Sequence, residues 1–189
     1  LEAKMYHIKN DKRAQASTEL ICAGLLACIQ EKPFARITIT DVQHASTVSR
    51  STFYRNFDCL EDVLALLCDR GFHAVFTEYN ALPPERRGSL AKAVFQYWFH
   101  NSAVLEALVQ IHRTDILFDS LRRSSGLIEA LQPMADDPAR FDYFVAIITS
   151  SMIGVLTVWV EHGKTETEDQ MVQKLTSAFI EMAILELPG

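Results

Sequence analysis

The chain has 189 residues, of which 49% are hydrophobic and 22% are charged. Apolar content this high excludes intrinsic disorder over most of the length, and seven Gly with six Pro exclude a collagen-like or low-complexity chain. The charge is unevenly spread, because residues 1–58 carry 8 Lys and Arg against 6 Asp and Glu, whereas residues 59–189 carry 10 against 18. An anionic partner therefore has to meet the first third of the chain.

The four cysteines do not have the spacing of a disulfide framework or a metal site. Cys22 and Cys28 lie six residues apart, and Cys59 and Cys68 lie nine apart, so neither pair forms the Cys-x-x-Cys motif of zinc and redox sites. We expect reduced cysteines in a cytoplasmic protein, with no metal and no cofactor. Residues 1–10 lack the apolar segment of a signal peptide, which favours the same location.

Apolar residues at helical spacing predict helices along the whole chain, and the hairpin dipeptides of strands are missing. The first helix is expected over 11–31, ended by Pro33, and a long helix from about 58 to 79. Between them, a Thr-x-x-Asp capping box at Thr38 starts a short helix over 39–45, and Ser49 caps a second over 50–56. After the linker 83–88, helices are expected over 89–101, 104–109, 114–123, 141–161 and 168–187, with a loop over 132–138.

The two short helices, joined by residues 46–49, predict a helix-turn-helix unit. Its facing positions must be apolar, which Val42, Ala45, Val48 and Phe53 satisfy, while the second helix presents hydrogen-bond donors on its outer face. The segments ITITDV at 37–42 and VSRSTFYRNF at 48–57 resemble the DNA-binding signature of TetR-family transcriptional regulators, and the resemblance covers roughly residues 11–67.

The resemblance implies an all-α homodimer with two domains. Residues 1–58, ordered from about 11 to 58, are expected to form an N-terminal three-helix helix-turn-helix DNA-binding domain. Residues 59–189 are expected to form a larger C-terminal helical ligand-binding and dimerisation domain, with the helix over 59–79 connecting the two. The family typically dimerises through its last two helices, here about 141–161 and 168–187.

The expected DNA contacts follow from the same resemblance and from the donors on the second short helix. Arg50 is expected to bind a guanine edge or a phosphate, with Ser51 and Thr52 next at base edges. Thr38, Thr40, Tyr54 and Asn56 are expected to position the unit on the phosphates, and Arg55 can contact a base edge or a phosphate. The full expected DNA-binding set is Thr38, Thr40, Ser49, Arg50, Ser51, Thr52, Tyr54, Arg55 and Asn56.

Two positions depart from the family pattern. Thr47 stands where the turn normally has Gly, so we expect either another turn geometry or strain. Leu60 stands where the family often has a phosphate-binding Lys, so one ionic contact is missing.

Residues 143–160 contain no charge over eighteen positions, the lower limit for a membrane-spanning helix. Because no basic cluster flanks the segment, we expect it to be covered by protein, including a partner subunit, and not by a membrane. The expected dimer interface consists of Ile148, Val155, Trp159, Leu175, Phe179 and Met182.

Aromatic residues are dense between Phe95 and Leu121, where they predict either an apolar effector pocket or ordinary core packing. The acidic, aromatic-rich composition favours a hydrophobic or cationic effector, and the loop over 132–138 is a candidate cover for the entrance. The expected pocket consists of Phe95, Trp98, Phe99, His100, Ile111, His112, Phe118, Phe144, Ile148 and Met152.

These patterns support an effector-controlled transcriptional regulator, most simply a repressor released from a palindromic operator. The alternative is a co-regulator of the same fold that acts through protein contacts with weak or no DNA binding, as Thr47, Leu60 and the scarce positive charge allow. An enzyme is not expected, because no catalytic motif is found.

Overall fold

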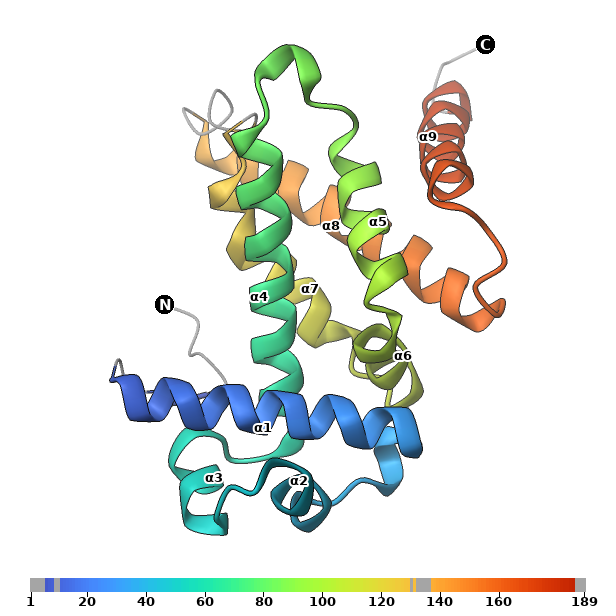
Figure 1. Cartoon of the computed structure of the whole chain (residues 1–189). Helices are drawn as coiled ribbons and strands as arrows, with labels where there is room; N and C mark the ends of the chain where they lie inside the picture. Colours follow the sequence, from blue (N-terminus) through green and yellow to red (C-terminus); the bar gives the residue numbers. More distant parts are fainter. Residues whose placement is uncertain (1–5, 9–10, 130, 132–136, 186–189) are drawn as a thin grey trace.

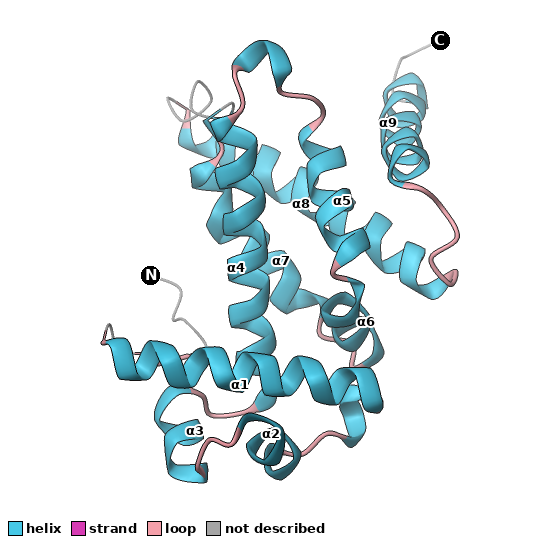
Figure 2. Cartoon of the chain, viewed as in Figure 1, coloured by secondary structure: helices cyan, strands magenta, loops and turns pink. Residues whose placement is uncertain are grey.

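The computed structural model of the chain describes residues 6–8, 11–129, 131 and 137–185, and the regular structure within them is helical apart from an isolated β-bridge between Tyr6 and Phe57 (Figure 2). The all-α prediction is confirmed. The helices are α1 (Lys12–Glu31), α2 (Ile39–Ser46), α3 (Arg50–Asn56), α4 (Leu60–Ala81), α5 (Leu90–His100), α6 (Ser102–Gln110), α7 (Thr114–Ser124), α8 (Pro138–Glu161) and α9 (Glu168–Leu185). Short 3-10 turns cover Phe34–Arg36, Pro84–Arg86 and Ser125–Leu127.

Two helix starts differ from the sequence-based expectation. α4 begins at Leu60 because the carboxylate of Asp62 accepts the backbone N–H groups of Asp58 at 2.7 Å and Cys59 at 3.1 Å. α8 begins three residues earlier than expected, at Pro138, where proline fits the first helical turn and Asp137 caps it. Residues 132–136 of the expected entrance loop and residues 186–187 of the expected last helix lie outside the described residues.

The first three helices gather at one end of α4, which runs away from them between α5 and α7 (Figure 1). α1 lies across α2 at close range, since a Cβ on Gly24 would stand 2.8 Å from the Cβ of Ser46. Ser46 is therefore buried against α1, and Ala45, which we expected to face inward, is exposed. The contact with α1, which local sequence does not reveal, sets the rotation of α2.

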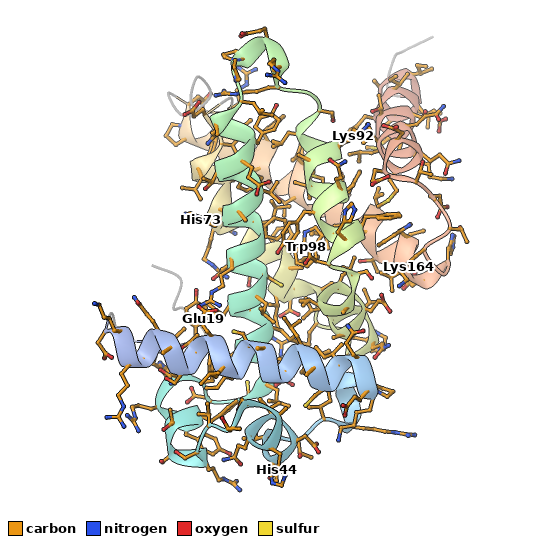
Figure 3. All side chains as sticks on the ribbon, in the orientation of Figure 1. Glu19, His44, His73, Lys92, Trp98 and Lys164 are labelled. Atoms are coloured by element: carbon orange, nitrogen blue, oxygen red, sulfur yellow. The ribbon has the colours of Figure 1, made fainter. Side chains whose placement is uncertain are left out.

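An aromatic cluster fills the interior between α4 and α5. Trp98 is 1% exposed, and its ring lies 5.4 Å from that of Phe72, which in turn stacks on Phe76 (Figure 3). Burial of each such side chain contributes about 1.5–3 kcal/mol to folding. The cluster holds α5 on α4 and so fixes the frame on which α8 packs.

α8 is long and apolar enough to cross a membrane by length and composition, with a mean hydropathy of 1.9, and 33% of that apolar window is buried inside the chain. Its inner face, which includes Met152 and Leu156, joins the hydrophobic core. Its outer face leaves Tyr143, Ile147 and Val158 exposed. α9 is visible at the margin of the molecule (Figure 1) and exposes further apolar side chains, so both helices carry apolar surface that the chain itself does not cover.

Candidate functional site

The start of α2 is fixed by a reciprocal capping box. The backbone N–H of Thr38 donates to the carboxylate of Asp41 at 2.7 Å, and the N–H of Asp41 donates to the Thr38 hydroxyl at 3.2 Å. Hydrogen bonds from the Lys32 ammonium and from Thr38 hold the pKa of Asp41 well below its usual range, so the carboxylate is ionised near neutral pH. Thr38 and Thr40 are exposed beside this cap, as their expected phosphate contacts require.

The turn between α2 and α3 uses the left-handed conformation despite the absence of glycine. Thr47 has φ 56° and ψ 18°, so the backbone takes the geometry that glycine would take, and the alternative of a different turn is excluded. A β-branched side chain is poorly accommodated there, which makes Thr47 a strained position.

Two phenylalanines anchor α3 to the interior. Phe53 and Phe57 are 1% and 0% exposed, and their rings lie 5.8 Å apart. Ser49 caps the helix by accepting the backbone N–H of Thr52 at 3.3 Å. With one face fixed inward, the opposite face of α3 points to solvent.

The exposed face of α3 carries two arginines. The Nη2 atom of Arg50 donates to the Tyr54 hydroxyl at 3.4 Å, and its guanidinium lies 5.5 Å from the centre of the Tyr54 ring. Nη2 of Arg55 donates to the hydroxyl of Thr52 at 3.4 Å. Among the described residues, neither arginine has a carboxylate partner, which leaves both charges available to an anion.

The placement of the other expected DNA contacts is mixed. Ser49, Ser51 and Tyr54 are exposed and Thr52 is half-buried. Asn56, by contrast, is 2% exposed and donates to the backbone carbonyl of Thr52 at 2.9 Å. Its expected phosphate contact is wrong, because the last turn of α3 rotates this side chain into the protein.

Arg13 is a residue that sequence reasoning missed. A hollow of about 160 Å³ lies between the start of α1 and the end of α3, and Arg13 and Arg55 both line it. No local signal marks Arg13, since its position depends on how α1 crosses α3. Leu60, at the position of the missing family lysine, is 8% exposed and belongs to the core.

A polar cluster connects the N-terminal segment 6–8 to α4 and α7, and we call it the Asp69 cluster. The Asp69 carboxylate accepts the Tyr6 hydroxyl at 2.8 Å, the Ser120 hydroxyl at 2.5 Å and the Arg123 guanidinium at 2.8 Å. Burial and the bond to Asp69 raise the pKa of Tyr6 well above its ordinary value. Because Tyr6 also bridges to Phe57, the cluster joins the end of α3 to the C-terminal helices.

A second contact of this kind joins α1 to α4. The Arg70 guanidinium forms an ion pair with Glu19, whose position on α1 Figure 3 shows, at 2.6 Å.

An apolar cavity of about 200 Å³ lies among α4, α5, α7 and α8. Of the expected pocket residues, Phe144, Ile148 and Met152 line it. The described lining is Phe76, Leu90, Ala91, Val94, Leu121, Ser125, Ile128, Leu131, Phe144, Val145, Ile148, Thr149, Met152 and Leu175.

The remaining expected pocket residues do not line this cavity. Ala91 and Val94 of α5 line it, whereas Phe95 and Trp98, on the same face of the helix, are buried in the core. Phe99 stacks on Trp159 at 5.4 Å. The others lie elsewhere on the fold, exposed or half-buried: His100, Ile111, His112 and Phe118.

A second apolar hollow of about 360 Å³ runs between α8 and α9, and we call it the α8–α9 groove. Five of the six expected interface residues line it, whereas Ile148 lines the cavity instead. The Trp159 indole donates to the carbonyl of Glu166 at 3.0 Å, and both residues line the groove. The five are Val155, Trp159, Leu175, Phe179 and Met182.

The described residues contain no group of three His, Cys, Asp or Glu that can hold a metal ion. The four cysteines are free thiols, and burial raises the pKa values of Cys22 and Cys59 to about 11. These thiols are therefore protonated near neutral pH and poor nucleophiles.

Comparison with known proteins agrees with this geometry. Residues 89–181 match a family described as "Transcriptional regulator C-terminal region" (TetR_C_8). The crystal structure of a TetR transcriptional regulator from Streptococcus agalactiae 2603V is similar, with a TM-score of 0.59 and 20% sequence identity, over 89% of this chain and 96% of that chain. A comparison with curated proteins gives no match. A helix-turn-helix unit at the N-terminal end, followed by this C-terminal region, leads to one conclusion: residues 89–181 are the C-terminal region of a TetR-family transcriptional regulator, and the chain has the fold of such a regulator.

Proposed function

We propose that the chain is a cytoplasmic, non-enzymatic repressor that binds palindromic operator DNA as a homodimer and is released by a small-molecule effector. Residues 1–58 serve as the DNA-binding domain, and residues 59–189 bind the effector and form the dimer. α4 connects the two, since Leu60 at its start lies beside α3 and Phe76 near its end lines the cavity.

The observation that carries the proposal is the exposed face of α3. Phe53 and Phe57 hold this helix from beneath, and Arg50 in its first turn is exposed without a described carboxylate partner. A recognition helix uses its first turn to contact base edges in the major groove. Thr38 and Thr40, exposed at the start of α2, and Arg13 beside Arg55 suit contacts with flanking phosphates.

Effector release requires that the ligand bind the DNA-incompetent arrangement better than the competent one. The cavity is suited to this task because its wall includes Phe76 of α4, the helix that carries the DNA-binding unit. A molecule that displaces Phe76 changes the path of α4 and thereby the spacing of the two recognition helices, which must reach major grooves about 34–36 Å apart.

The test is selection of a binding site from randomised duplexes, followed by titration of the chosen site with Arg50→Ala. One bidentate base contact is worth about 1–3 kcal/mol, so the affinity of the variant falls by about 5- to 150-fold. Raising the salt concentration weakens wild-type binding by about 0.9 log unit per neutralised phosphate for each log unit of salt.

Arg86→Ala is the matched control, because Arg86 is an exposed arginine in the 3-10 turn after α4 and lies on no surface assigned to DNA. It leaves the affinity unchanged. If no palindrome is enriched at low salt, the proposal of a repressor is wrong. That result supports the second candidate, a co-regulator that acts through protein contacts. Leu60 favours that candidate, since it places a buried apolar side chain where the family often has a phosphate-binding lysine.

A further inference from the structure

The cavity among α4, α5, α7 and α8 has no charged side chain in its described lining. Two hydroxyl groups are present. Ser125 already donates its hydroxyl to the carbonyl of Arg122 at 2.7 Å and can only accept from a ligand, which leaves Thr149, 1% exposed, as the hydroxyl that can donate to one. The remaining wall consists of aliphatic and aromatic carbon.

Charge on a ligand is costly in such a site. An ion buried without a partner loses its hydration and gains nothing in return, whereas an apolar group is favoured in proportion to the area it removes from water. Of the carboxylates on neighbouring elements, Asp69 binds Arg123 and Glu129 binds Arg87 at 2.8 Å, while Asp142 lines the adjacent hollow and not this cavity. The cationic effector allowed by the acidic composition therefore has no counter-ion among the described residues of this cavity.

Size sets the second limit. Apolar cavities of about 150 Å³ bind benzene, and this one measures about 200 Å³. In proportion, it accommodates roughly eight non-hydrogen atoms. The volume therefore suits a single ring with a short substituent.

We infer that the effector is a small, uncharged, apolar molecule, a single aromatic ring or a short alkyl chain with at most one hydrogen-bonding group directed at Thr149. The inference rests on the proposed effector-binding role of the C-terminal helices, and it specifies the chemistry of that site. It also predicts entry by partition from water, driven by burial of apolar area and accompanied by a negative heat-capacity change.

Three probes of similar size test the inference on the full-length protein without DNA: ethylbenzene, benzylammonium and benzoate. Calorimetric titration and thermal unfolding report binding. Ethylbenzene binds once per chain and raises the Tm, since a ligand of the folded state stabilises it. The two ions bind about tenfold more weakly or not at all.

Two variants locate the bound probe. Ala91→Leu fills the cavity and lowers ethylbenzene affinity by about tenfold or more, while Ala23→Leu, the same change at an exposed position of α1, leaves it unaltered. Phe144→Ala enlarges the cavity and shifts the preference to butylbenzene. Tight binding of either ion, or ethylbenzene binding that neither cavity variant alters, overturns the inference.

The outcomes separate this inference from the proposed function. If ethylbenzene occupies the cavity but no operator is selected from random duplexes, the inferred ligand class stands and the proposed repressor function is wrong. If a palindrome is selected and the ions bind better than ethylbenzene, the proposed repressor function stands and the inferred ligand class is wrong.

Discussion

Strain at a single residue marks the turn that orients the recognition helix. Thr47 holds φ 56° between α2 and α3, where the Cβ of an L-residue meets its own backbone. This conformation costs about 1–2 kcal/mol for a residue other than glycine. Its neighbour Val48 is 8% exposed, so packing on both sides of the turn keeps Thr47 in place.

Thr47→Gly is expected to stabilise the protein. Relief of strain exceeds the added flexibility of the unfolded chain, so the free energy of unfolding rises by about 0.5–1 kcal/mol. Urea unfolding followed by circular dichroism measures the change. Thr47→Val keeps the branched Cβ and gives no gain. A lower stability for the glycine variant would show that contacts of the Thr47 hydroxyl or methyl group stabilise the fold by more than the left-handed backbone conformation destabilises it.

At the scale of elements, the Asp69 cluster joins segments far apart in the sequence. Tyr6 comes from the N-terminal segment, Asp69 from α4, and Ser120 and Arg123 from α7. The neighbouring residue Leu121 lines the cavity, and Tyr6 bridges to Phe57 at the end of α3. One carboxylate therefore lies between the wall of the cavity and the recognition helix.

Asp69→Ala leaves three donors without their acceptor. Because the Asp69 and Arg123 side chains are only 18% and 25% exposed, water replaces these bonds poorly, and the variant loses about 2–4 kcal/mol of stability. Urea unfolding checks this, with Glu78→Ala at an exposed position of α4 as control. Tyr6→Phe removes one bond and costs about 1 kcal/mol. Equal stabilities for Asp69→Ala and Glu78→Ala would mean that the cluster adds nothing to the fold.

What the sequence predicts well is what local chemistry determines. The caps at Thr38 and Ser49 set their helices within one residue, because each cap needs only groups three or four positions away. The start of α4 shows the limit of this reasoning, since Asp58 was expected to cap the helix, whereas Cys59 is the N-cap residue and Asp62 accepts the backbone N–H groups of both. Helix type and order along the chain follow from apolar spacing alone.

What the sequence predicts poorly depends on contacts between helices. Asn56 is polar and sits on the recognition helix, yet the path of the chain into α4 turns it inward. The aromatic residues of α5 have the right chemistry for a pocket, but α4 covers Phe95 and Trp98. A periodic stripe tells which face of a helix is buried, and only the tertiary arrangement tells whether protein or a cavity lies beyond it.

At the scale of the whole molecule, α8 and α9 leave an apolar surface without a cover. Val158, Ile180 and Met182 are 47%, 56% and 58% exposed, and the α8–α9 groove lies between the two helices. Contiguous apolar surface of this kind marks an interface in a soluble protein. Leu175 lines both the groove and the cavity, so an effector bound as proposed would touch a residue that also lines the expected dimer interface.

Ala178→Glu tests the dimer, because Ala178 is exposed and lines the α8–α9 groove. A carboxylate buried in the interface on each subunit loses its hydration, and Lys174, one turn earlier in the groove, already pairs with Glu166 at 3.8 Å. We expect wild type to sediment as a dimer without detergent and the variant as a monomer with unchanged helix content. Gln96→Glu, at an exposed position of α5, keeps the dimer. The predicted dimer interface is wrong if the wild-type chain stays monomeric or needs detergent to stay in solution. The apolar face of α8 would then be a surface for another partner.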